Sequence, residues 1–154
     1  STFQMIVGRS GQTLSGKWQS EGTKTFLGLH SNGFPNLFIV TGPQGGGGSF
    51  NFTDAIDAHS DYLAWLLTTM RERGLDIVDV RKEDEEGYAE HCRMADIATA
   101  PLRDCLSYYN GHGEAEPGSL AYYGGRRWNT YKDEAQASLN PYLFGHQTQG
   151  APVD

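Results

Sequence analysis

The stretch from Phe34 to Met70 constrains the fold most, because an apolar run, a glycine turn and a helix pattern follow one another directly. Four consecutive apolar residues after a proline predict a strand over Phe34–Thr41 that is buried on both faces, as in parallel sheets covered by helices. Gly42-Pro43 ends this strand. Asn51 then caps a predicted helix of about five turns, which Gly74 closes.

The other predicted elements are shorter and less regular. Residues 1–33 show little apolar periodicity beyond a possible strand near Phe3–Val7. A second helix starts in the acidic run at 83–86, whose side chains we expect to be solvated, and Pro101 should end it. The remaining expectations are a short strand at 75–80, exposed or leading into the second helix, a strand at 120–123, a last helix from about Asn129 and a disordered tail from Gln147.

Composition excludes several classes of partner and site. With 12 basic and 19 acidic residues the net charge is −7, which disfavours nucleic acid and anionic membrane surfaces. No apolar run approaches the ~20 residues that span a bilayer. The two cysteines and five histidines lack metal-ligand spacing, so we predict no metal site, reduced thiols and a cytoplasmic location.

The glycine turn between the predicted strand and helix is the best candidate for chemistry. Glycine backbone can approach a ligand closely, and a helix N-terminus offers free N–H groups to phosphate or to an electron-rich ring edge. The glycines match neither Gly-x-Gly-x-x-Gly nor a phosphate-binding loop. With no nucleophile elbow in the chain, the residues alone predict a cofactor-contacting α/β segment without its own catalytic residues. The composition also suits a loop-rich domain, which is one alternative. Another is that Gly45–Ser49 is the flexible linker of an engineered fusion.

Several short motifs occur along the chain in a defined order. They are Trp18 with Thr25–Leu29, Gly33–Pro43, Asn51–Tyr62, Lys82–Glu85, Met94–Asp96, Ser107–Gly111 and Tyr122–Gly125. Taken in this order, they resemble the final third of the type I Baeyer–Villiger monooxygenases, which use FAD and NADPH. The resemblance covers residues 8–145.

The resemblance implies a partial dinucleotide-binding (Rossmann-like) FAD domain with a mostly helical C-terminal appendage. Residues 1–74 would be the C-terminal segment of the FAD-binding domain, 75–146 the appendage and 147–154 the tail. The family's two glycine fingerprints, its signature sequence and its catalytic arginine lie upstream in family members, and none is present in these 154 residues. We therefore expect a piece of a longer enzyme, inactive alone.

The same resemblance implies roles for particular residues. Gly42 and Pro43 would pass the flavin, while Asn51 and Phe52 would face the pyrimidine edge of its ring. A substrate-facing bulge would consist of Gly47, Gly48, Ser49 and Phe50. Tyr108 would stand where the family has a mobile tryptophan near NADPH. No catalytic residue and no metal ligand is expected in the chain.

The function that the resemblance implies is conversion of ketones to esters or lactones with NADPH and O2. The partners would be the ketone, O2 and the N-terminal remainder of the same enzyme. One alternative is a segment of a flavin monooxygenase that oxidises nitrogen or sulfur. Another is a non-catalytic binding or assembly module, in which the aromatic clusters, including Trp128, are simply core.

Overall fold

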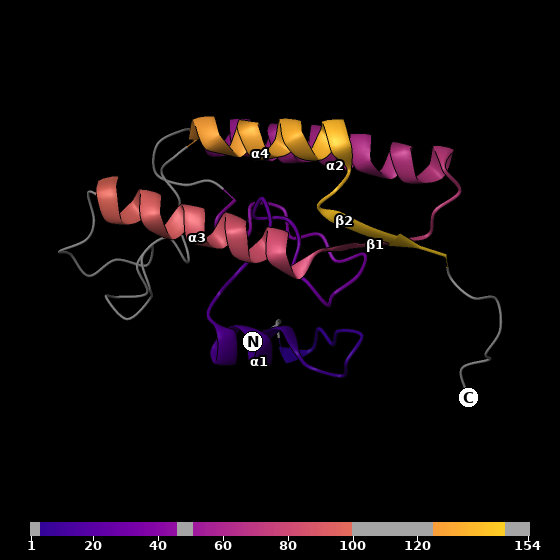
Figure 1. The fold of residues 1–154 in the computed structure, drawn as a ribbon, viewed down its shortest axis with the longest axis horizontal. Helices are drawn as coiled ribbons and strands as arrows, with labels where there is room; N and C mark the ends of the chain where they lie inside the picture. The colour runs from indigo at the N-terminus through magenta and orange to yellow at the C-terminus, as the bar shows by residue number, and fades with distance from the viewer. Residues whose placement is uncertain (1–3, 46–50, 100–124, 147–154) are drawn as a thin grey trace.

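The computed structural model describes residues 4–45, 51–99 and 125–146. Its elements, in chain order, are α1 (Leu14–Glu21), α2 (Phe52–Glu72), β1 (Ile77–Val80), α3 (Lys82–Thr99), α4 (Gly125–Ser138) and β2 (Tyr142–Gly145). In Figure 1, α2 and α4 run together along one side, α1 lies on the opposite side and α3 passes between. Within the described residues we find no helix whose length and hydropathy would suit a membrane span.

Helix α2 forms where the sequence predicts it. The Asn51 side chain accepts a hydrogen bond from the Thr53 amide at 3.1 Å, which caps the helix. Arg71 lies in the last turn, where a positive charge favours the helix dipole. Gly74 follows with a φ of 65°, a left-handed conformation that glycine adopts readily. The buried side chains recur every three or four residues: Ala55, His59, Tyr62, Leu66 and Met70.

The predicted strand over Phe34–Thr41 is wrong. This segment is a series of turns, in which Asn36 and Thr41 have φ values of 59° and 52°. Such left-handed residues interrupt an extended strand. Ile39 donates one backbone hydrogen bond to Leu29, and Val40 is 44% exposed rather than buried. The apolar run therefore covers one side of the core without entering a sheet.

The only sheet within the described residues is the antiparallel pair β1 and β2, in which Ile77 lies opposite Gly145 and Val80 opposite Tyr142. β1 matches the predicted strand at 75–80, although it is largely buried. The sequence analysis missed β2 and α1, and α4 begins earlier than expected, at Gly125. In the described part of the predicted strand near Phe3–Val7, Val7 makes an isolated bridge to Thr13, and Phe3 lies outside the described residues. Pro101, residues 120–123 and the tail lie outside the described residues.

The core is built around aromatic rings from distant parts of the chain. Phe26 makes edge contacts with Tyr88, Tyr131 and Tyr142, at centroid distances of 5.8, 6.5 and 6.1 Å. Edge-to-face geometry of this kind stabilises aromatic pairs beyond the area they bury. Trp128, on α4, is 5% exposed and belongs to the same core. The described residues thus form a small α/β unit, in which four helices and one antiparallel strand pair surround this aromatic core.

A buried ion pair fastens α1 to α3. Lys17 and Glu85 are 4% and 1% exposed, and the Lys17 Nζ lies 2.7 Å from the Glu85 Oε2. Ser31 and Asn32 complete the site, because the Nζ also donates to the Ser31 hydroxyl at 3.0 Å and the Asn32 carbonyl at 2.9 Å. Burial raises the pKa of the Glu85 carboxyl, and Lys17 beside it opposes that rise. The expectation of a fully solvated acidic run is therefore wrong for Glu85.

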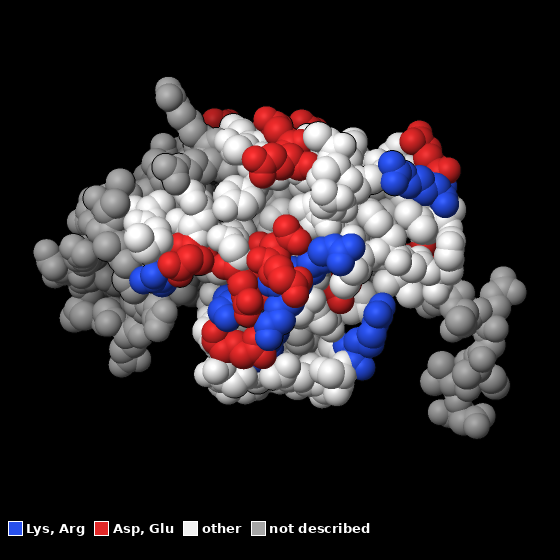
Figure 2. All heavy atoms as spheres, viewed as in Figure 1, with Lys and Arg blue, Asp and Glu red and all other residues white. Residues whose placement is uncertain are grey.

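Apart from this pair and the buried Asp79, most charged side chains in the described residues lie at the surface. Figure 2 shows basic and acidic side chains mixed over α1 and the start of α3. Lys24 and Lys82 both approach the Glu86 carboxylate, at 3.7 and 3.9 Å. Exposed pairs at such distances contribute little to stability. The buried pair is the one that matters for the fold.

Replacing Glu85 by Gln should destabilise the chain strongly, because Lys17 would remain charged in a buried site. Removing one partner of a buried pair costs about 3–5 kcal/mol. Urea denaturation of the wild type, Glu85→Gln, Lys17→Met and the Lys17→Met/Glu85→Gln double variant measures this. We expect the double variant to lose less than the sum of the single losses. Strict additivity would show that the two charges do not depend on each other.

Candidate functional site

Three glycines bring the segment after the apolar run against an earlier loop. The Gly42 amide donates to the Gly28 carbonyl at 3.1 Å. A Cβ on Gly28, whose φ is 71°, would lie 1.9 Å from the Gly45 Cα, and a Cβ on Gly42 would lie 2.6 Å from the Gly28 oxygen. Side chains at these positions would separate the two backbones. The glycines therefore fix the turn Thr41–Gly45 in place.

Hydrogen bonds from buried side chains complete this turn. Gln44 is 2% exposed; its Oε1 accepts from the Thr25 amide at 2.9 Å and its Nε2 donates to the Thr23 carbonyl at 3.0 Å. The Tyr88 hydroxyl donates to the Gln44 carbonyl at 2.8 Å. Gln44 and Thr41 have φ values of 64° and 52°. Non-glycine residues in this conformation persist where the surroundings hold them, and they cluster at functional sites.

His59 connects α2 to the turn. Its Nδ1 accepts a hydrogen bond from the Thr41 amide at 3.0 Å, so the proton of the neutral ring lies on Nε2. The ring stacks on Trp128, with centroids 5.2 Å apart and planes 23° apart. Burial lowers the pKa of His59 from 6.5 to about 4. His30 is also buried, and burial, followed by the effect of His59, lowers its pKa to about 3.

The predicted site residues that the structure describes lie in a turn and at the start of a helix. Gly42 and Pro43 are within the turn Thr41–Gly45, and Asn51 and Phe52 open α2. Phe52 is 65% exposed. Gly47, Gly48, Ser49, Phe50 and Tyr108 lie outside the described residues, so their predicted roles stay predictions.

The sequence analysis missed His59 and Gln44, which hold this turn. Five scattered histidines gave no reason to single out His59, and one glutamine in a loop carries no signal. Gly28 lies in one of the recognised motifs, but its approach to Gly45 depends on the fold. Among the described residues no group of three or more His, Cys, Asp or Glu side chains is placed to hold a metal ion.

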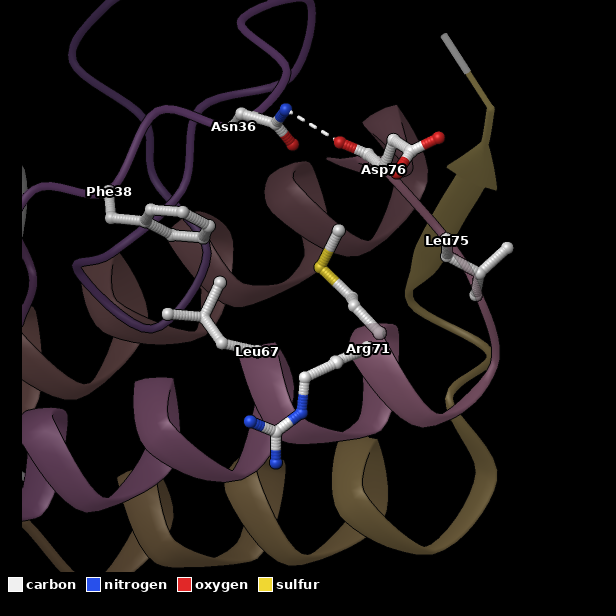
Figure 3. A pocket seen from close by; sticks show the side chains of 7 residues that line it. Asn36, Phe38, Leu67, Arg71, Leu75 and Asp76 are labelled. Atoms are coloured by element: carbon white, nitrogen blue, oxygen red, sulfur yellow. Dashed lines mark hydrogen bonds between the residues drawn. The ribbon is translucent and has the colours of Figure 1, made fainter.

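A hollow lies near the C-terminal end of α2, away from the turn. It has a volume of about 430 Å³ and is lined by Asn36, Phe38, Leu67, Met70, Arg71, Leu75 and Asp76. Figure 3 shows Phe38 and Leu67 facing each other across it. The Asn36 amide is used structurally, because it donates to the Asp76 carbonyl and accepts from the Val78 amide, both at 2.9 Å. Arg71 lies roughly 28 Å from Phe52 along the helix axis, so this hollow is separate from the turn.

Comparison with known proteins gives a consistent result, although no family model matches the chain. It is 39% identical over 147 residues to the neopentalenolactone D synthase of Streptomyces avermitilis, an alignment that covers 87% of this chain and 24% of the relative. It is 34% identical over 136 residues to a Baeyer–Villiger monooxygenase of Streptomyces coelicolor, covering 80% of this chain and 22% of that protein. The chain thus spans about a quarter of the length of these relatives.

A solved structure agrees with the sequence matches. The structure described as oxidized steroid monooxygenase bound to NADP superimposes with a TM-score of 0.75 and 27% identity, over 92% of this chain and 26% of that one. Sequence and fold both identify the chain as a relative of monooxygenases. More particularly, it matches a C-terminal segment of the Baeyer–Villiger monooxygenases, which confirms the resemblance of its motifs.

The two buried histidines should make the chain sensitive to acid. Each has a pKa near 6.5 when unfolded and about 3 or 4 when folded, so the unfolded state binds more protons below pH 6.5. Stability is then complete above pH 6.5 and falls as the pH drops towards 4. Each histidine contributes up to about 1.4 kcal/mol per pH unit.

Urea denaturation at pH 7, 6 and 5 tests this expectation. His30→Phe and His59→Asn should each make the unfolding free energy depend less on pH. The raised pKa of Glu85 acts in the opposite direction, because it favours the folded state in acid. Unchanged slopes in both variants would contradict the prediction.

Proposed function

We propose that this chain is a C-terminal segment of a Baeyer–Villiger monooxygenase that converts ketones to esters or lactones with NADPH and O2. The observation that carries the proposal is the match over 87% of the chain to a curated relative, together with the structural match over 92% to an NADP-bound steroid monooxygenase. Residues 1–74 would complete a Rossmann-like FAD-binding domain, and 75–146 would form its helical appendage. The preceding part of the enzyme would hold the adenosine and pyrophosphate.

In this proposal, four described residues would face one edge of a flavin ring. Gly42 and Pro43 lie in a turn whose shape is fixed by neighbouring backbone, so it could meet a flat ring without rearranging. Asn51 and Phe52 open a 21-residue helix, whose N-terminal partial positive charge would favour negative charge on the pyrimidine edge of a reduced flavin. The exposed Phe52 ring adds apolar surface. When bound, FAD would supply the redox chemistry with O2, and this chain would bind and orient it.

The remaining site residues are assigned on the resemblance. Gly47, Gly48, Ser49 and Phe50 would face the ketone, and Tyr108 would contact NADPH. None of these is a catalytic residue in the proposal, since the reacting centre would lie in the preceding part of the enzyme.

Product analysis tests the activity: the complete enzyme, given NADPH, O2 and a ketone, should form a product one oxygen atom heavier, identified as an ester or lactone by mass spectrometry. Oxidation at nitrogen or sulfur with no ester from any ketone would contradict it.

The 154-residue chain alone should bind no FAD, because it would contact only one edge of the ring. The purified chain should therefore be colourless, and titration with FAD should leave the flavin fluorescence unchanged. The complete enzyme, purified in the same way, is the control and should be yellow. A stoichiometric flavin absorption spectrum from the isolated chain would contradict this prediction.

Gly48→Leu in the complete enzyme should discriminate against large ketones, because a bulky side chain would fill the proposed substrate-facing bulge. One pocket contact is worth ~1–3 kcal/mol, or about 10–200-fold in specificity. The measurement is the ratio of kcat/KM for a large and a small ketone. Phe50→Ala should shift this ratio the opposite way, and flavin reduction by NADPH should stay nearly unchanged in both. A ratio equal to that of the wild type would remove this loop from the substrate site.

A further inference from the structure

The two described parts of the proposed flavin-facing site belong to different elements. Gly42 and Pro43 lie in the turn Thr41–Gly45, whereas Asn51 and Phe52 open α2. A flavin edge that contacts both needs them at a fixed separation. The residue that sets this separation need not itself contact the flavin. Its role, inferred below, rests on the proposed function.

His59 contacts the turn at both of its ends. At one end its Nδ1 accepts from the Thr41 amide at 3.0 Å. At the other end a Cβ on Gly45 would lie 2.9 Å from the His59 Cε1, so the ring lies directly against the Gly45 backbone. His59 is about two helical turns after Asn51 on the same rigid helix. The imidazole is therefore a spacer between the turn and the start of α2.

The ring itself is held firmly. It stacks on Trp128, whose indole Nε1 donates to the Leu27 carbonyl at 3.0 Å. His59 is 1% exposed, and its Nε2 makes no hydrogen bond to the described residues. Its hydrogen bonding in this part of the chain is thus directed to Thr41 through Nδ1.

Thr41 needs such a contact. Its φ of 52° is unusual for a β-branched residue, and conformations of this kind persist only when neighbours hold them. The His59 acceptor satisfies the Thr41 amide in that conformation. Because burial lowers the His59 pKa to about 4, Nδ1 stays an acceptor at neutral pH.

We propose that His59 is a positioning residue: by accepting from the Thr41 amide and packing on Gly45, it aligns the Gly42-Pro43 turn with the Asn51-Phe52 helix start so that both contact the same flavin edge. His59 does not touch the flavin. It acts through the backbone of Thr41.

Two substitutions separate the hydrogen bond from the packing. His59→Asn keeps an acceptor near the position of Nδ1, whereas His59→Phe keeps a ring on Trp128 without an acceptor. In the complete enzyme we would measure hydrogen exchange at the Thr41 amide and the dissociation constant for FAD. His59→Phe should speed Thr41 exchange and weaken FAD binding, each by about tenfold, the equivalent of one lost hydrogen bond. His59→Asn should restore both to within about threefold of wild type.

Tyr62→Phe is the matched control on the same helix. It removes the buried contact between the Tyr62 and Tyr142 hydroxyls, 2.5 Å apart, without touching the turn. It should lower stability but leave Thr41 exchange and FAD affinity unchanged. If His59→Phe behaves like Tyr62→Phe, His59 is only a core residue and the proposal is overturned. Should His59→Phe fail to fold, His59→Asn decides alone, because fast Thr41 exchange there contradicts the proposal.

The two proposals fail in different ways. If the complete enzyme binds no flavin, the proposed function is wrong, while Thr41 exchange still reports whether His59 holds the turn. If the enzyme binds flavin and forms esters but Thr41 exchange is equal in wild type and His59→Phe, the function stands and the role of His59 falls.

Discussion

The pairing of Lys17 with Glu85 is the constraint on which the rest of the described structure depends. Neither charge can be buried without the other, since the desolvation of an unpaired ion is far too costly. Ser31 and Asn32 fill the remaining hydrogen-bonding positions around the pair. The loop between α1 and the turn Thr41–Gly45 is thereby bound to α3, and this loop carries Gly28, against which the turn is packed.

A second carboxylate extends the same arrangement. Asp79 on β1 accepts from the Gly33 amide at 3.2 Å and the Val80 amide at 2.9 Å, and burial raises its pKa. Buried backbone groups need partners, and in a segment without regular structure side chains must provide them. Asn36, Gln44 and His59 serve the same purpose further along. A long irregular loop is in this way made rigid enough to present a defined turn.

The sequence predicted a structural element well where the residues that determine it lie close together along the chain. Helix α2 was predicted because its capping residue and the regular spacing of its apolar side chains are both local features of the sequence. The predicted strand at Phe34–Thr41 was wrong because an apolar run does not reveal that Asn36 and Thr41 adopt left-handed conformations. Lys17 and Glu85 are 68 positions apart, so no local pattern joins them. The flavin-facing roles of Gly42, Pro43, Asn51 and Phe52 stay predictions from the resemblance, whereas the contacts of His59 required the three-dimensional arrangement.

The aromatic core also has a consequence for the order of folding. The Trp128 indole bonds the Leu27 carbonyl across 101 positions, and the Tyr142 hydroxyl lies 3.2 Å from the His30 ring across 112. Such long-range contacts slow folding, because the entropy of closing a long loop is lost before the contacts stabilise the chain. During synthesis from the N-terminus, the glycine turn emerges from the ribosome well before Trp128, the residue on which the His59 ring stacks. Thr25, His59 and Tyr88 can bond the turn first, and α4 adds the stacking contact on His59 last.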